Sequence, residues 1–398
     1  MTSRTTKNPD VRLNLTVQDW MQAIRKPTPY RVGSSVTLNT NMIRLGIVIA
    51  IAFVIFFVVL PVYTNDSCGI DKYSKDLKYN NTYPLSKTIT LADGSFRFRI
   101  AVVTDLDTES KSINEKSTWY SYYRKGYLIW NPSKNTAKIE WDQETKKLIS
   151  NVAAKGRSME LSELIVFNGK LYTVDDRTGI VYQISEENQV IPWVILSNGD
   201  GKQVQGFKSE WATVKDERLY IGGLGKEWTT QTGQFVNTYP QWIKSIGPNG
   251  DIKHLDWSEN YNKLREVAGF ESPGYMIHES AYWSDIHKKW IFLPRRASKE
   301  KYDETLDENR GTNLLFLADE EFKNIHYQRV GPLNPSRGFS SFKFIPGTNN
   351  RVIVALKSEE RNEKPVASYI TIFTITGNVL LAEEPLEGAF KFEGIEFI

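Results

Sequence analysis

Cysteine and histidine are scarce in this chain of 398 residues, which has one cysteine, Cys68, and four histidines. An internal disulfide is therefore impossible, and a zinc site with the usual cysteine and histidine spacing is not expected. Basic clusters are also missing, because 50 lysines and arginines are interspersed with 47 acidic residues, and this argues against a nucleic-acid partner. No GxxxxGK[ST] phosphate loop occurs. The remaining donors are carboxylates, hydroxyls and carbonyls, which suit calcium or magnesium.

One long apolar run, LGIVIAIAFVIFFVVLPVY at residues 45–63, carries no charge over 19 positions. A helix of this length spans roughly 28 Å, about one hydrocarbon core. The 44 residues before it are mostly basic among their charges, so the positive-inside rule places the N-terminus in the cytosol. A cleaved signal peptide would have a shorter run nearer the start. We therefore expect a cytosolic tail over 1–44, a membrane helix over 45–63, a lumenal stem over 64–86 and a folded domain over 87–398.

The predicted stem has three features that depend on this orientation. Glycosylation sequons at Asn65 and Asn80 would face the lumen. Cys68 lies just beyond the predicted helix and could at most join two chains into a homodimer. Cleavage of the stem would release a soluble form of the folded domain.

Short strands separated by Gly, Asn and Asp turns dominate the folded domain, and only residues 260–268 have a helical period, so the fold class is all-β. Residues 158–184 combine a polar tip, two short strands and an acidic turn, and related units follow along the chain. Their uneven spacing favours propeller blades with variable outer loops over a solenoid. The chain ends within a strand, which we expect to complete a blade begun by the N-terminal part of the domain.

Each repeated unit carries a polar residue at the tip of its first strand. These tips are Ser162, Glu210, Glu279, Ser340 and Glu393. Equivalent tips in a propeller converge on the central axis, where their oxygens would form a ring of ligands for a hard cation. The alternative is that five strands begin with polar residues that bind nothing, and the spacing alone leaves both interpretations open.

Several long motifs carry a resemblance to a known family. VVTDLDTES, MELSELIVFNGKLYTVDDRTG, EWATVKDERLYIGGLGKEWT, GYMIHESAYWSD and FEGIEFI resemble the calcium-activated nucleotidases, the apyrase family that includes salivary enzymes of blood-feeding insects. The match runs from about Tyr79 to Ile398, and the domain layout is similar to that of the vertebrate membrane-anchored members. The resemblance implies a five-bladed β-propeller with Ca²⁺ in its central tunnel, which hydrolyses nucleoside diphosphates and some triphosphates.

The resemblance also implies a substrate class and a setting. UDP, GDP and UTP are the expected substrates, and UDP and GDP are preferred in the vertebrate members. A single-pass type II membrane protein of the Golgi or endoplasmic reticulum would use this activity to clear UDP from glycosyltransferase reactions in the lumen.

Individual residues receive roles from the same resemblance. The calcium ligands correspond to the five tips and to Glu163, which would act through its backbone if at all. The catalytic acids correspond to Asp105 and Asp176, and we expect one of them to orient and deprotonate the attacking water. The basic residues that handle phosphate correspond to Arg177, Lys226, Arg295 and Arg296. Among these, Arg295 is our candidate for holding the terminal phosphate.

Structural roles for some of these residues remain open. The pair Asp175 and Asp176 would also suit a hairpin turn, and Arg295 with Arg296 would suit a solvated strand edge. Four tryptophans would suit either blade packing or stacking on a nucleobase, namely Trp119, Trp211, Trp228 and Trp283. The competing functional hypothesis is a non-catalytic lumenal binding module in which calcium only locks the blades.

Overall fold

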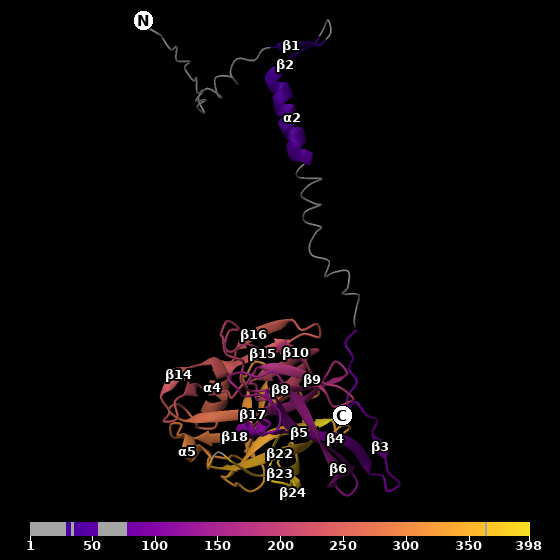
Figure 1. Ribbon diagram of the computed structural model, residues 1–398, viewed down its shortest axis with the longest axis vertical. Coiled ribbons are helices and arrows are strands. Elements are labelled where there is room, and N and C mark those ends of the chain that lie inside the picture. The colour runs from indigo at the N-terminus through magenta and orange to yellow at the C-terminus, as the bar shows by residue number, and fades with distance from the viewer. Residues whose placement is uncertain (1–28, 33–35, 55–77, 363) are drawn as a thin grey trace, which may run out of the picture. The chain divides into compact units, whose positions relative to one another are not determined.

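The computed structural model describes residues 29–32, 36–54, 78–362 and 364–398 (Figure 1). The chain divides into two compact units, residues 1–78 and 79–398. In the first unit, β1 (Pro29–Val32) pairs with β2 (Val36–Asn39), and α2 (Thr40–Val54) follows. Within the described residues, no helix has both the length and the apolar character needed to cross a membrane. Residues 55–63 of the predicted span lie outside the described residues, as do Asn65 and Cys68.

Five antiparallel sheets of four or more strands form the second unit, counted over its described residues. The first contains β25 (Lys391–Phe397), β4 (Phe96–Asp105), β5 (Trp119–Asn131) and β6 (Thr136–Ser150), and the short β3 (Ile89–Thr90) pairs with β4. The second contains β7 (Leu161–Phe167), β8 (Lys170–Asp175), β9 (Ile180–Ile184) and β10 (Val190–Ile195). The third contains β11 (Trp211–Lys215), β12 (Arg218–Gly222), β15 (Trp242–Ile246) and β16 (Ile252–Asp256). The fourth contains β17 (Tyr275–Ser284), β18 (Lys289–Ser298), β19 (Leu314–Asp319) and β20 (Ile325–Arg329). The fifth contains β21 (Arg337–Phe344), β22 (Val352–Arg361), β23 (Lys364–Thr374) and β24 (Val379–Pro385).

Helices are few in this unit, as its turn-rich sequence predicts. The helix expected near 260–268 is present as α4 (Ser258–Val267), which buries Tyr261 and Leu264 on one face. A single turn, α5 (Glu304–Asp307), begins at Asp303, whose side chain accepts hydrogen bonds from two N–H groups of the turn. A small hairpin of β13 (Trp228–Thr229) and β14 (Phe235–Asn237) extends from the third sheet.

The sheets close into a circle, because the last strand of the chain pairs with the first long one. β25 runs antiparallel to β4 from Lys391 opposite Asp105 to Phe397 opposite Ile100, and Figure 1 shows the C-terminus beside β4. The innermost strands β25, β7, β11, β17 and β21 contact one another in a closed ring. The prediction of a five-bladed propeller closed by the C-terminal strand is therefore confirmed.

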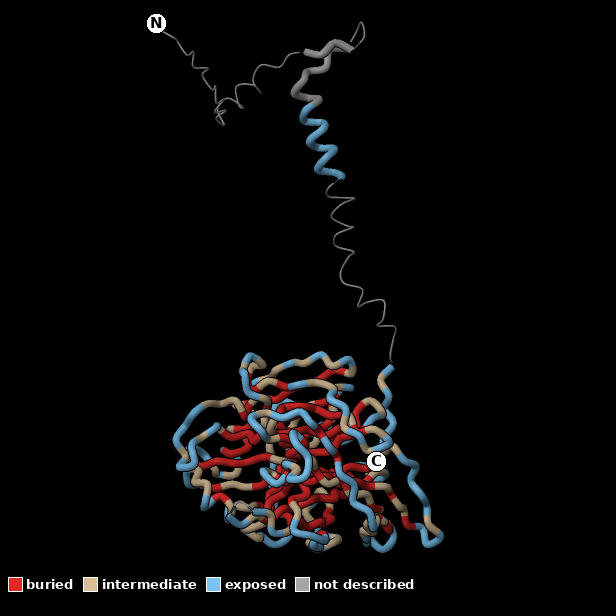
Figure 2. Tube along the Cα trace, viewed as in Figure 1, coloured by how far each residue is buried: buried red, intermediate tan, exposed pale blue. Residues whose placement is uncertain are grey.

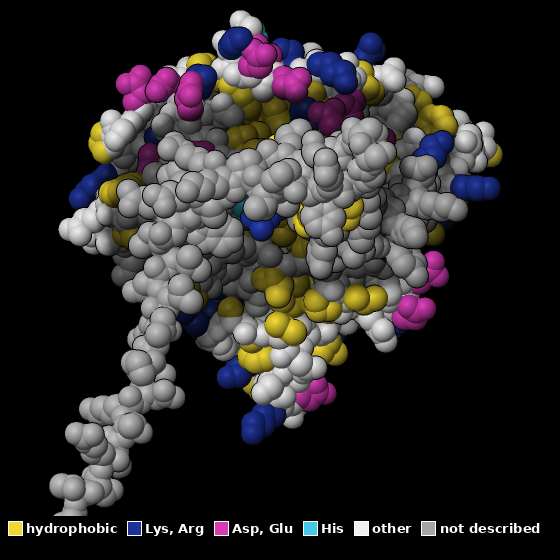
Figure 3. Space-filling view, turned by 90° about the horizontal axis from the view of Figure 1, so that it is seen from above, with side chains coloured by type: hydrophobic (Ala, Val, Ile, Leu, Met, Phe, Trp, Pro, Cys, Tyr) yellow, Lys and Arg dark blue, Asp and Glu magenta, His cyan; other side chains and the backbone are white. Residues whose placement is uncertain are grey.

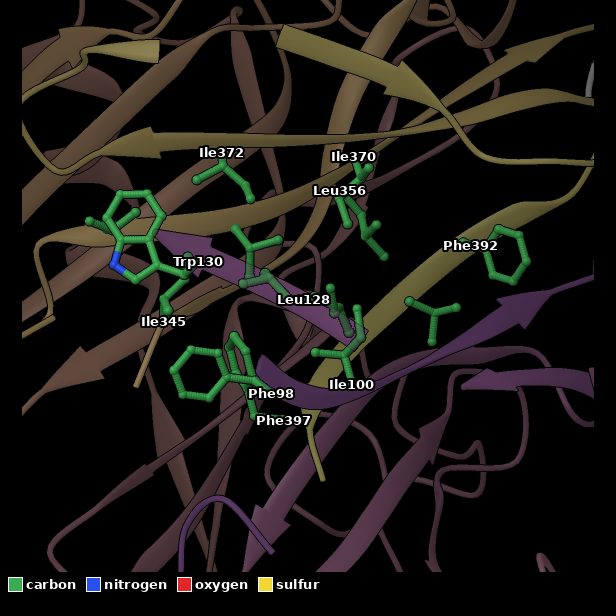
Figure 4. Close-up of a cluster of buried hydrophobic side chains, with 14 of the residues drawn as sticks. Phe98, Ile100, Leu128, Trp130, Ile345, Leu356, Ile370, Ile372, Phe392 and Phe397 are labelled. Carbon is green, nitrogen blue, oxygen red and sulfur yellow. The ribbon is translucent and has the colours of Figure 1, made fainter. Parts of the chain in front are cut away.

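Alternate residues of one strand face different neighbouring blades. In β4, Ile100 and Val102 join the cluster between the fifth and first blades, whereas Ala101 and Val103 join the cluster between the first and second. Each of the five blade junctions has such a cluster, so the interior strands are buried on both faces (Figure 2). Figure 4 shows the junction of the fifth and first blades, where Phe392 of β25 lies among the packed side chains. This two-sided burial explains apolar runs such as VIVAL and LIVF.

The compact unit begins at Tyr79, eight residues before the predicted boundary. The Tyr79 ring lies 5.6 Å from that of Phe167, and the Tyr83 hydroxyl donates a hydrogen bond of 3.0 Å to Glu396. Residues 79–86 therefore belong to the propeller rather than to a stem. Their contacts are to distant residues, which is why their local sequence did not predict them.

Candidate active site

Three of the predicted tips are the extra residues of β-bulges in their strands. In β7 the register passes from Leu161 to Glu163 and leaves Ser162 without a partner in β8. Ser340 in β21 and Glu393 in β25 are left over in the same way. A β-bulge of this kind interrupts the ladder and re-aims a side chain. The same backbone irregularity thus recurs in three blades at the position that carries the candidate ligand.

The other two tips occupy corresponding positions in the third and fourth blades. Glu279 lies in the irregular stretch of β17 between His278 and Ala281. Glu210 directly precedes β11, and its N–H donates to the carbonyl of Gly222 at 2.8 Å. The five tips, which we call the axial ring, each lie four or five residues before the last residue of an innermost strand and so share one level of the propeller.

The glutamates of the axial ring are held by basic side chains. Lys208 Nζ lies 2.7 Å from Glu210, while Arg295 pairs with Glu279 and, at 2.8 Å, with Glu393. Burial raises the pKa of Glu210 to about 8, with Glu279 adding to the effect and Lys208 opposing it. Buried carboxylates this close together favour a positively charged occupant.

The donor set fits a hard cation. Ser162 Oγ is buried and has no hydrogen-bond partner among the described residues, whereas Ser340 Oγ donates to the carbonyl of Phe392 at 3.0 Å. A buried hydroxyl without a partner is costly, and a bound cation would supply one. The axial ring offers hydroxyl and carboxylate oxygens, the ligands that calcium takes. Ser162, Glu210, Glu279, Ser340 and Glu393 are thus the residues that would hold it.

Glu163 lies outside the axial ring. Its carboxylate is 3.1 Å from Lys343 Nζ and accepts a hydrogen bond of 2.8 Å from Ser341 Oγ. Its backbone carbonyl accepts a hydrogen bond from Thr173 Oγ1 at 2.8 Å. Its carbonyl and Oε1 therefore have protein partners, whereas Oε2 is buried without a hydrogen-bond partner among the described residues. Through Oε1, Glu163 links the second and fifth blades.

Asp105 ends β4, next to the axial ring. Its carboxylate lies 2.6 Å from Lys391 Nζ and accepts the N–H of Asp107 at 2.8 Å. Burial raises the pKa of Asp105 to about 7, although Lys391 opposes the rise. A carboxylate with this pKa changes protonation near neutral pH, as a general base requires. Oxygens of Asp105, Asp107 and Glu160 lie within 4.8 Å of one another.

Asp175 and Asp176 differ in role: one stabilises the turn, and the other is available for catalysis. Asp175 stabilises the turn, accepting the N–H of Arg177 at 3.0 Å and the hydroxyl of Thr178 at 2.9 Å. Asp176 instead pairs with Lys208 through one oxygen. Its other oxygen is buried without a hydrogen-bond partner among the described residues. Asp176 therefore has the free acceptor that a water-orienting role needs, and Asp175 does not.

Arg295 and Arg296 are not on a solvated strand edge. Arg295 is 2% exposed, and besides the two ring glutamates it contacts Glu360 at 2.7 Å. Arg296 bridges Asp307 at 2.7 Å and Glu360 at 2.8 Å. Burial alone would raise the pKa of Glu360, but Lys391 and the two arginines together lower it. Glu360 is thus a charged anchor for both guanidinium groups.

The other two basic candidates differ in accessibility. Arg177 donates to Glu160 at 3.0 Å, and 32% of its side chain is exposed. Lys226 is buried; its Nζ donates to the carbonyl of Glu227 at 2.9 Å and lies over the Tyr302 ring at 4.2 Å. Burial lowers the pKa of Lys226 to about 8. No ion pair to Lys226 occurs among residues that the structure describes.

The tryptophans separate into two groups. Trp119, Trp211 and Trp283 are buried in the clusters between blades, so their packing role is accounted for. Trp228, in β13, is 37% exposed, and it is the one of the four that is not buried.

Sequence reasoning missed Lys208 and Lys391. Each precedes a ring glutamate by two positions, in the triplets KSE at 208–210 and KFE at 391–393. This repeated Lys-x-Glu pattern was a usable signal, because in two blades it sets an ammonium group two positions before the candidate ligand at the start of an innermost strand. On the face visible in Figure 3, basic and acidic side chains are interspersed around the rim.

Fold and site together define a closed β-propeller with an oxygen-donor axial ring beside a network of acidic and basic side chains. A model of the apyrase family matches residues 106–398. A protein of Rattus norvegicus named soluble calcium-activated nucleotidase 1 is 55% identical over 321 residues, which cover 81% of this chain and 78% of the relative. The apyrase apy-1 of Caenorhabditis elegans is 46% identical, with 90% and 97% covered, and an apyrase of Cimex lectularius is 40% identical, with 93% and 99% covered.

The chain therefore belongs to the apyrase family. This confirms the family resemblance inferred from the motifs, and membership implies hydrolysis of nucleotide phosphates.

Proposed function

We propose that this protein is a calcium-dependent hydrolase of nucleoside diphosphates, with UDP and GDP preferred and UTP among the triphosphates accepted. The observation that carries the proposal is the axial ring, where β-bulges in three adjacent blades fall on residues with oxygen donors. The naming of relatives as calcium-activated nucleotidase supports calcium as the ion.

The residues beside the axial ring suit cleavage of a phosphoanhydride. Asp105 or Asp176 accepts a proton from the attacking water. The oxygen of that water bonds to the terminal phosphorus, and the bond between this phosphorus and the leaving nucleotide breaks. Arg177 and Lys226 contribute positive charge for the phosphate oxygens. Calcium, when bound, neutralises phosphate charge and fixes the substrate. Arg295 is no longer our first candidate for the phosphate ligand, because its guanidinium already contacts three carboxylates.

Phosphate release from UDP tests the activity directly. Release should require calcium and stop when a chelator removes it. A protein that binds calcium and is stabilised by it, but releases no phosphate from any nucleotide, would be the non-catalytic binding module instead. Glu210→Ala and Glu279→Ala should each lose the calcium-dependent stabilisation, which grows as RT ln(1 + [Ca]/Kd). Lys215→Met, at the other end of β11, is the matched control.

We propose a lumenal location in the Golgi or endoplasmic reticulum, with residues 45–63 as the membrane anchor. In support, the side chains of Leu45, Ile47 and Val48 in α2 are exposed in its compact unit. A stem containing Cys68 could also join two chains or be cleaved. Protease protection of the propeller in sealed microsomes is the expected result, together with a glycan at Asn65 or Asn80. Digestion without detergent would overturn the orientation.

A further inference from the structure

Two lysines each connect a glutamate of the axial ring to an aspartate outside it. Lys208 Nζ contacts Glu210 at 2.7 Å and also pairs with Asp176. Lys391 Nζ contacts Asp105 at 2.6 Å and lies 3.7 Å from Glu393. The two lysines lie beside different blades, yet both stand two positions before their glutamate.

We propose that Lys208 and Lys391 compete with calcium for the ring carboxylates and, once displaced from them, bind the phosphate oxygens of the nucleotide. This inference rests on the proposed function. The physical reason is that an ammonium group and a divalent cation at the same carboxylate repel each other and share its lone pairs. Calcium has the larger charge and binds more ligands, so it displaces the ammonium group from the carboxylate.

The aspartates keep the displaced lysines near the substrate. Asp176 and Asp105 lie outside the axial ring, so they still hold Lys208 and Lys391 when the ring glutamates turn to calcium. A lysine side chain has a flexible stem and three donors, which allows it to exchange partners within a small radius. The side chain of Lys208 is 26% exposed, so it is already accessible to a ligand.

Arg295 provides the fixed part of the network. Its guanidinium contacts Glu279, Glu360 and Glu393, so Glu393 keeps a basic partner after Lys391 moves. Lys391 Nζ has four carboxylates within 3.7 Å, but an ammonium group on a flexible stem exchanges partners more easily than a planar guanidinium held by three carboxylates. The lysines are therefore the mobile cations and Arg295 is the static one.

A partner exchange of this kind makes calcium and nucleotide bind cooperatively. Calcium releases the lysines that the nucleotide needs, and the nucleotide holds the lysines away from the carboxylates that calcium needs. The coupling must be the same in both directions, and such factors are typically about 5- to 150-fold. We expect wild-type protein to bind calcium tighter by a factor in this range when nucleotide is present.

Isothermal titration of the purified full chain measures this coupling. Calcium affinity is determined with and without α,β-methylene-UDP, an analogue that cannot be cleaved between its phosphates, for wild type, Lys208→Met, Lys391→Met and Lys208→Arg. The matched control is Lys215→Met. Lys215 ends β11 and, like Lys208, pairs with two carboxylates, here Asp216 and Glu320, but it does not touch the axial ring.

The two methionine variants should bind calcium more tightly than wild type without the analogue, by about threefold to tenfold, and should lose most of the coupling. Lys208→Arg should retain coupling, and Lys215→Met should match wild type. If calcium affinity falls or stays the same in both methionine variants while coupling is intact, the lysines are structural and the proposal is wrong. An absence of coupling in wild type overturns it as well.

These outcomes are independent of turnover. If the wild type shows the coupling but releases no phosphate from UDP, the proposed function fails while the exchange stands. If it releases phosphate but its calcium and nucleotide binding are not coupled, the partner exchange is refuted and the proposed function stands. Should Lys208→Met not fold, Lys391→Met and the wild-type titration still decide the question.

Discussion

Removal of the Ser162 hydroxyl should change stability in opposite directions with and without calcium. Ser162 Oγ is buried without a hydrogen-bond partner among the described residues, so Ser162→Ala removes an uncompensated polar group. Such a group costs roughly 1–3 kcal/mol when buried. In chelator, the variant should therefore be more stable than wild type by about 1 kcal/mol, allowing for the small space left behind.

Ser340→Ala is the matched control, because this serine occupies the same bulge position in another blade. Its hydroxyl donates to the carbonyl of Phe392, so its removal in chelator should cost about 1 kcal/mol. With calcium, both variants should lose part of the calcium-induced gain, and a tenfold weaker site corresponds to a loss of ~1.4 kcal/mol at saturating calcium. The readout is urea unfolding of each variant in chelator and in calcium.

Two outcomes would refute this reasoning. If Ser162→Ala is destabilised in chelator as much as Ser340→Ala, the Ser162 hydroxyl has a partner in the protein. If Ser162→Ala keeps the full calcium-induced gain, its oxygen is not a ligand and the axial ring binds the ion through its other members.

Asp105→Asn should lower kcat for UDP roughly 10²- to 10⁴-fold; near-normal kcat would leave Asp176 as the base. In the wild type, kcat/KM should fall as pH drops below about 7, since burial raises the pKa of Asp105 to about 7 and only the carboxylate accepts a proton; a flat profile down to pH 5 would contradict this. Arg295→Ala should destabilise the protein by about 3–5 kcal/mol in chelator, because Glu279 loses its ion-pair partner among the described residues and Glu360 and Glu393 each lose one of theirs; unchanged urea unfolding with a raised KM would restore Arg295 as a phosphate ligand. Tyr83→Phe should cost about 1 kcal/mol through the lost hydrogen bond to Glu396, and an unchanged unfolding curve would show that residues 79–86 add nothing to the propeller.

The fold could be predicted from the sequence, because the residue patterns that identify its strands and turns are local. Turn residues bound each strand, and apolar runs mark strands buried on both faces. The pairing of the C-terminal strand also followed, since a strand without a partner leaves an exposed edge. The compact unit begins at Tyr79, before the predicted boundary at residue 87, because residues 79–83 are held by contacts to Phe167, Asn168 and Glu396 far along the chain.

The candidate site could be predicted only in part from the sequence. The five tips share a position in a repeated unit, so local pattern was enough to group them. Glu163 was added through the family resemblance, with a backbone role if any, and its side chain meets Lys343, because side chains of successive strand residues point in different directions. The roles of Asp175 and Asp176 differ for the same reason.

The sequence by itself determined the repeated units and their order, the closure of the propeller and the oxygen chemistry of its axis, because these follow from periodicity and residue type, and the family resemblance supplied the number of blades. Only the tertiary structure decided which charges meet. Lys391 reaches Asp107 across 284 positions, and Arg295 reaches Glu393 across 98. No local pattern encodes such pairs, since propeller closure brings every blade to one axis whatever the separation along the chain. The same closure gave the Ser340 hydroxyl a hydrogen-bond partner and left the Ser162 hydroxyl without one among the residues that the structure describes.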